Sequence, residues 1–120
     1  MAERKEDIIR SGGNGRRSTT VCYGGLCYVS GITSVVLEGD MRTQAQDVFN
    51  QIDRLLASVG TDKTRVLRAS CILNTMEEYP DFNAVWDTWV VDGHEPARSM
   101  TAADLTLSEY RLAVSVIAAL

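Results

Sequence analysis

The sequence predicts an α+β domain in which two helices pack on one face of a mixed β-sheet. Three observations support this prediction: β-rich runs lie toward both ends of the chain, two segments have helical periodicity, and the elements follow the order β-β-α-β-α-β-β. The chain has 120 residues, of which 45% are hydrophobic and 23% are charged, and both values are typical of globular proteins. A chain of this length is expected to form one domain, spanning residues 1–120.

A tight hairpin is predicted in the first quarter of the chain. The β-rich runs TTVCY and LCYVSG lie on either side of Gly24 and Gly25. Two glycines in a two-residue loop favour a primed turn, because both positions require a positive φ. The preceding stretch SGGNGRRS, residues 11–18, has little pattern and is predicted to be a loop.

The first helix is predicted to run from an N-cap at Asp40 to about Val59. Gly60 suits the left-handed conformation that commonly follows the end of a helix. Apolar residues repeat along this segment at three- and four-residue spacing and form one stripe: Ala45, Val48, Ile52, Leu55, Leu56 and Val59.

A strand is predicted at RVLRASCILN, residues 65–74, and a second helix is expected to start at about Met76. Gly93 and Pro96 are expected to close this helix. Its aromatic residues share one face, whose expected role is core packing: Tyr79, Phe82, Trp86 and Trp89.

Two further strands are predicted in ARSMTAADL and in EYRLAVSVIAAL. The last run alternates, so that one of its faces is fully apolar and the other carries small, mixed residues. Two helices can cover only one face of such a sheet. The other face is therefore expected to be covered by self-association, for which a closed symmetric oligomer is the usual arrangement.

Charge, cysteine usage and the N-terminal sequence restrict the function classes. The formal net charge of −4 argues against a nucleic-acid surface, because phosphate binding normally needs a basic face. The segment MAERKEDIIR lacks the apolar region of a signal peptide, and no apolar run is long enough to span a bilayer. Three cysteines, Cys22, Cys27 and Cys71, indicate reduced core thiols of a cytoplasmic protein. The single histidine, His94, is expected to lie in a loop, and no metal or cofactor is expected.

Arg98 lies directly behind a proline and an alanine, at the start of a predicted strand. A charge at that position must be paired, be solvated, or be available to an anion. Asp104 or Glu109 could pair with it, either between strands or between subunits, which would make the arginine structural. Alternatively, its guanidinium is suited to bidentate recognition of a carboxylate.

Four stretches of the sequence, CYVSG, TQAQDVFNQIDRLLASVG, FNAVWDTWV and PARS, resemble the Rid family in order and spacing. These proteins are the reactive-intermediate deaminases also called YjgF proteins, and WDTWVVDGHEPAR is most similar to the YoaB-like branch. The resemblance covers the chain from about Ser18 to Leu120. It implies a chorismate-mutase-like fold and a homotrimer whose central barrel buries the second face of each sheet. It also implies ligand clefts between subunits, in which enamines and imines are hydrolysed to 2-keto acids and ammonia.

The resemblance assigns roles to individual residues. It implies that Arg98 is the catalytic arginine that holds the substrate carboxylate, and that the backbone of Met100 contacts the ligand. Ser30 matches a residue that lines the cleft, and Asn83 matches the asparagine of the second helix that borders it. Ser18 matches the serine of the family's first motif.

Two positions depart from the family pattern. Arg17 replaces the tyrosine of the first motif, and it is expected to be either a solvated loop charge or a second anion contact that would favour a dicarboxylate. The glutamate that the family's best deaminases carry on the last strand would fall near Ala113. That glutamate is thought to position or activate the attacking water, so its absence puts the standard deaminase chemistry in question here. Ser30 could then help to hold the attacking water.

Two functions from different classes therefore remain open. The first is an imine or enamine deaminase that acts on a small carboxylate-bearing substrate. The alternative is a trimeric binding module, a sensor or regulator, which keeps Arg98 for a carboxylate metabolite without turnover. The RNA cleavage attributed to some relatives fits poorly, because the chain is acidic and lacks interleaved basic and aromatic residues.

Overall fold

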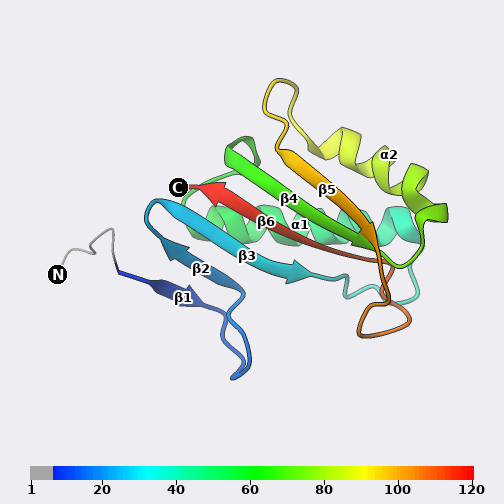
Figure 1. Ribbon diagram of the computed structural model, residues 1–120, viewed down its shortest axis with the longest axis horizontal. Coiled ribbons are helices and arrows are strands. Elements are labelled where there is room, and N and C mark those ends of the chain that lie inside the picture. The colour runs from blue at the N-terminus through cyan, green and yellow to red at the C-terminus, as the bar shows by residue number, and fades with distance from the viewer. Residues whose placement is uncertain (1–6) are drawn as a thin grey trace.

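A six-stranded sheet backed by two helices forms the part of the chain that the computed structural model describes, residues 7–120 (Figure 1). The strands are β1 (Ile9–Ser11), β2 (Thr20–Tyr23), β3 (Leu26–Ile32), β4 (Val66–Leu73), β5 (Ala97–Ala102) and β6 (Leu112–Ala119). The helices are α1 (Met41–Ser58) and α2 (Tyr79–Trp89), with short 3-10 turns η1 (Lys63–Arg65) and η2 (Met76–Glu78). The predicted α+β class is confirmed.

The strand order in the sheet is β1-β2-β3-β6-β4-β5. Strands β4 and β5 are parallel, and every other neighbouring pair is antiparallel. A parallel pair needs a crossover connection, and here that connection contains α2. In this strand order β5 forms one edge of the sheet, and α2 lies alongside it (Figure 1).

The local signals of the sequence are confirmed at the hairpin and at the first helix. Gly24 and Gly25 have φ angles of 62° and 83°, as a primed turn between β2 and β3 requires. The Asp40 side chain caps α1 by accepting a 2.9 Å hydrogen bond from the N–H of Thr43. Gly60, with φ of 83°, follows the end of α1.

Two elements differ most from the prediction, and the last two strands are also shorter than expected, at Ala97–Ala102 and Leu112–Ala119. The first is β1, which was predicted to be loop at Ser11; its three residues are all exposed on an edge strand, so no alternation of burial marks it in the sequence. The second is α2, which begins after the 3-10 turn η2 and ends at Trp89 rather than near Gly93. The β-branched Val90 is already extended at the helix end, and Gly93 instead occupies a later turn with φ of 84°.

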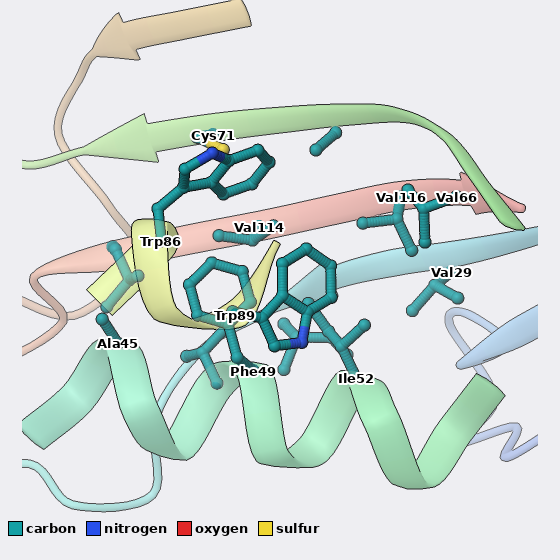
Figure 2. Close-up of a cluster of buried hydrophobic side chains, with 14 of the residues drawn as sticks. Val29, Ala45, Phe49, Ile52, Val66, Cys71, Trp86, Trp89, Val114 and Val116 are labelled. Atoms are coloured by element: carbon teal, nitrogen blue, oxygen red, sulfur yellow. The ribbon is translucent and has the colours of Figure 1, made fainter. Parts of the chain in front are cut away.

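An aromatic cluster fills the space between the helices and the sheet (Figure 2). The ring of Phe49, from α1, stacks on that of Trp89 at 4.5 Å between centroids and lies 5.9 Å from both Phe82 and Trp86. These four rings are buried, whereas Tyr79 is half-buried at the margin of the core. The predicted core role of the α2 aromatic stripe is therefore confirmed.

The two faces of the sheet differ as the alternation in the last strand predicts. Toward the helices, β6 buries Leu112, Val114, Val116 and Ala118, whereas the intervening residues are only half-buried. On the opposite face, Ser115, Ser70 and Ser99 lie in register across β6, β4 and β5. Both helices lie on the same side of the sheet, so neither covers this second face (Figure 1).

Truncating Phe49 tests the central role of the aromatic cluster. Phe49→Ala is expected to lower the free energy of unfolding by about 3–5 kcal/mol, because it removes a fully buried ring and leaves a cavity. Urea denaturation measures this difference. The adjacent exposed substitution Asn50→Ala is the matched control and should change stability by no more than about 0.5 kcal/mol. Equal effects of the two substitutions would contradict the packing described.

The three cysteines are buried free thiols, as predicted, and Cys71 lies on β4, in register with Met100 of β5. Burial raises the pKa of the Cys71 thiol to about 12, although the nearby Arg98 charge acts in the opposite direction. At pH 8 its thiolate fraction is then only about 10⁻⁴. Native protein treated with iodoacetamide is expected to keep Cys71 unmodified, and unfolding in guanidinium should release its reactivity. Equal alkylation rates at Cys71 in the native and unfolded chains would refute this prediction.

Candidate functional site

The side chain of Arg98 extends from β5 toward α2, where three residues hold its guanidinium. Nη1 donates a 2.9 Å hydrogen bond to Oδ1 of Asn83, and Nη2 donates one of 2.9 Å to the hydroxyl of Tyr79. The guanidinium carbon lies 4.8 Å from the centroid of the Trp86 ring and 5.8 Å from that of Tyr79, both within cation–π range. The guanidinium is therefore fixed in orientation by two hydrogen bonds and an aromatic surface.

The fold brings these residues together for reasons that can be traced in the sequence. Tyr79, Asn83 and Trp86 are spaced by four and three residues, so they share one face of α2. Helix α2 is the crossover between β4 and β5, which places this face beside the start of β5. Arg98 points to the helix side of the sheet, whereas the adjacent Ser99 takes part in a 3.2 Å contact with Nη2 of Arg68.

The hydrogen bonds around Arg98 leave several N–H and O–H donors without an acceptor. A guanidinium has five N–H donors and no acceptor, so the amide oxygen of Asn83 must face it and the amide NH₂ is turned elsewhere. The Tyr79 hydroxyl accepts from Arg98 and keeps its own hydrogen to donate. Among residues 7–120, neither the amide NH₂ nor this hydroxyl hydrogen has an acceptor.

No carboxylate of the described residues pairs with Arg98, whose two side-chain partners are both neutral. An inter-strand ion pair with Asp104 or Glu109 of the same chain is therefore wrong, and both of these acidic residues are exposed. The pairing of Arg98 with an acidic residue of another subunit stays a prediction. A half-buried cation with free donors beside it has the chemistry that binding of an anion requires. A planar carboxylate suits it best, since a guanidinium can bind both oxygens at once.

Met100 lies two residues after Arg98 on the same face of β5, and its side chain packs against the hydrophobic core. Because β5 is an edge strand, part of its backbone has no partner strand within the chain. The backbone of Met100 therefore lies on the same edge strand as Arg98, and its contact with a ligand stays a prediction.

Ser30 and Arg17 belong to a second group, on the other half of the sheet. Ser30 lies in a bulge of β3, where its N–H donates to the carbonyl of Thr19 at 2.9 Å. Its Oγ is buried and has no hydrogen-bond partner among the described residues. Arg17 is exposed and donates from Nη1 to the carbonyl of Gly12 and to Oγ1 of Thr19, each at 2.9 Å. Ser18, half-buried, lies between Arg17 and Thr19 in the same loop.

Within one chain, this second group is separated from Arg98. Strands β6 and β4 lie between β3 and β5, and three strand spacings amount to about 14 Å. Ala113 is likewise remote, because it pairs with Ile72 on the face of the sheet turned away from the helices. A site that combines Arg98 with Ser30, Arg17 or position 113 would therefore need residues from a second copy of the chain.

Two residues of the Arg98 site were missed by sequence reasoning, which assigned Tyr79 and Trp86 only to the core. Their spacing from Asn83 was the available signal, because a polar residue on the same helix face as two aromatic rings marks the margin of a core. Among residues 7–120 no group of three or more histidine, cysteine or acidic side chains gathers as a metal site would require. No helix in that range is long and apolar enough to cross a membrane.

Comparison with known proteins identifies relatives along nearly the whole chain. The family model described as "Endoribonuclease L-PSP" matches residues 13–120. A RutC family protein of Haemophilus ducreyi is 32% identical over 113 residues, covering 94% of this chain and 97% of that protein. The RutC family protein YoaB of Escherichia coli K12 is 30% identical over 112 residues, covering 93% and 97%.

The fold has close counterparts among solved structures. The crystal structure of a YjgF-family protein from Neisseria meningitidis superimposes with a TM-score of 0.91 at 37% sequence identity, and the match covers 97% of both chains. These relatives agree with the resemblance of the sequence motifs. The chain therefore belongs to the RutC/YjgF family, which is the Rid family.

Proposed function

We propose that the protein hydrolyses imine and enamine intermediates of amino acids to 2-keto acids and ammonia. The observation that carries this proposal is the set of unused donors around Arg98, which has no carboxylate partner in the described chain. A 2-imino acid carries its carboxylate directly beside the C=N bond. Binding of the carboxylate by Arg98 would therefore fix the position of the reacting carbon as well.

The reaction needs little more than orientation and water. Water adds to the carbon of the protonated C=N bond, the C–N bond then breaks, and the products are a 2-keto acid and ammonia; an enamine first takes a proton on carbon to become the imine. Arg98 would hold the carboxylate by two parallel charge-assisted hydrogen bonds. The Asn83 amide and the Tyr79 hydroxyl supply further donors beside it. Such positioning can account for much of a modest barrier.

A homotrimer with ligand clefts between subunits is the second part of the proposal. The face of the sheet that bears Ser70, Ser99 and Ser115 has no helix over it, so a partner would be needed to bury it. The separation of Ser30 from Arg98 within one chain supports the same arrangement. In a closed trimer, β5 of one subunit would lie near the β3 bulge of its neighbour.

A non-catalytic binding module is the alternative function, and two observations favour it. The side chains that contact Arg98 are an amide, a phenol and an indole, so no carboxylate or imidazole base accompanies the guanidinium. Position 113, where the family's best deaminases would carry a glutamate, is alanine. The same anion receptor could then bind a 2-keto acid or related carboxylate without turnover.

Substitution of Arg98 separates these functions. Imines are generated in place with an amino-acid oxidase, and their loss is followed with a semicarbazide trap. Wild type is expected to accelerate imine loss, and Arg98→Ala should reduce kcat/KM by about 100-fold or more, since two charge-assisted hydrogen bonds are lost. Arg98→Lys keeps the charge but not the two-pronged geometry, and it should recover only a small part of the activity.

The control for this experiment is Arg42→Ala, which removes an exposed arginine of α1 with a 62% exposed side chain and should leave kcat/KM unchanged. If wild type does not accelerate imine loss but binds pyruvate in an Arg98-dependent manner, the protein is the binding module. If pyruvate binding does not depend on Arg98 and no turnover is seen, both functions are excluded.

Subunit complementation tests the position of the cleft. Ser30→Ala removes a buried hydroxyl that has no partner, so it should not harm folding, but it is expected to lower activity if Ser30 lines the cleft. Arg98→Ala and Ser30→Ala chains are then mixed in equal amounts, unfolded and refolded together. About one interface in four would combine an intact Arg98 from one chain with an intact Ser30 from its neighbour, so about one quarter of the wild-type activity should return. If no activity returns after the two variants are refolded together, the whole site lies within one chain.

A further inference from the structure

Cys22 and Cys27 form a pair of thiols that the proposed function does not use. They lie directly opposite each other in the register of β2 and β3, on the buried side of the hairpin. Cys71 lies on β4, separated from the β3 strand of this pair by β6.

The hairpin geometry places the two cysteines at disulfide-forming distance. Gly24 and Gly25 form a two-residue turn, so the pair that closes it, Tyr23 and Leu26, is the hydrogen-bonded kind. Pairs alternate along an antiparallel ladder, which makes Cys22 and Cys27 a non-hydrogen-bonded pair with Cα atoms about 4.5 Å apart. This separation lies at the short end of the range of about 4.4–6.8 Å in which disulfides form.

The two thiols differ in access to small molecules. Cys22 lines a cavity of about 430 Å³ at the turn end of the hairpin, together with Tyr23, Ser58 and Leu120. Cys27 is completely buried, and burial together with the neighbouring Cys22 raises the pKa of its thiol to about 12. A small oxidant would therefore meet Cys22 first, with Cys27 in place behind it.

We propose that Cys22 and Cys27 are a reversible oxidation site that reacts with hydrogen peroxide to form a disulfide across the hairpin. Cys22 sulfur attacks one peroxide oxygen, the O–O bond breaks, and Cys22 becomes a sulfenic acid with release of one water. The Cys27 sulfur then attacks the Cys22 sulfur, and the sulfenic oxygen leaves as a second water. In sum, two thiols and one peroxide give one disulfide and two water molecules, with two electrons passing to the peroxide.

The same geometry makes the disulfide easy to reduce. A bridge between directly opposed strands at the short limit of Cα separation is strained, and strained disulfides have more oxidising potentials than ordinary structural ones. Glutathione is therefore expected to restore both thiols. The inference concerns the hairpin alone and is independent of the imine chemistry proposed for Arg98.

Peptide mass spectrometry of the intact protein tests the inference. Reduced protein is exposed to hydrogen peroxide, quenched with catalase, unfolded in guanidinium with iodoacetamide, and digested with trypsin. Cleavage after Arg17 and Arg42 releases Cys22 and Cys27 together in peptide 18–42, whereas Cys71 is released in peptide 69–98. The expected result is a peptide 18–42 that carries no alkyl group and lacks two hydrogens, beside an alkylated Cys71. Glutathione added before the unfolding step should return two alkylation sites to peptide 18–42.

Two variants complete the test. Cys71→Ala should leave the peroxide response unchanged, and Cys27→Ala should stop at a Cys22 sulfenic acid that dimedone captures. If Cys27→Ala does not fold, the wild-type peptide decides the question alone. Full alkylation of peptide 18–42 after peroxide treatment, or oxidation confined to Cys71, would overturn the proposal. A disulfide that glutathione leaves intact would overturn its reversibility.

Discussion

The packing of Phe49 against the aromatic rings of α2 is the interaction on which the rest of the structure depends. It joins α1 to α2 and both helices to the sheet, because Trp89 stacks on Phe49 while Trp86 lies at its edge. Trp89 is further fixed by a 2.8 Å hydrogen bond from its indole N–H to Asp53 of α1. The same Trp86 ring supports the guanidinium of Arg98. Trp86 thus belongs both to the core and to the surroundings of Arg98, so the orientation of the guanidinium depends on the position of α2.

The neutral partners of Arg98 are the basis of the proposed anion binding. A half-buried charge loses part of its hydration, and in most proteins an acidic residue offsets this loss. Here the compensation comes from neutral acceptors and from the faces of aromatic rings, which stabilise the cation without neutralising it. The net positive charge therefore remains available, in a chain whose formal net charge is −4. An anionic ligand would supply the negative charge that no described side chain places beside Arg98.

Sequence reasoning succeeded where a residue has one strong local preference. Gly24-Gly25 and Asp40 fixed a turn and a helix start, and the alternation in β6 gave the correct buried face. It failed at β1, whose three exposed residues carry no periodicity, and at the last turn of α2, where Val90 departs from the helix before any glycine. Arg98 was singled out from its position, but its partners Tyr79 and Trp86 were not. Aromatic residues on one helix face give the same sequence pattern whether they pack in a core or line a site. Whether Ser30 joins Arg98 depends on contacts between copies, about which a single sequence carries no local signal.

The place of β6 in the sheet has a consequence for how the domain is made in the cell. β6 is synthesised after every other described strand, yet it lies between β3 and β4 and contributes four buried residues to the core. Until it leaves the ribosome, β3 and β4 present facing strand edges with no partner between them. The sheet can therefore be completed only after β6 has emerged, since β6 joins strands from distant parts of the chain. Until β6 emerges, the unpaired edges of β3 and β4 stay exposed and can pair with other chains. This is the stage of synthesis at which chaperones would protect the polypeptide from aggregation.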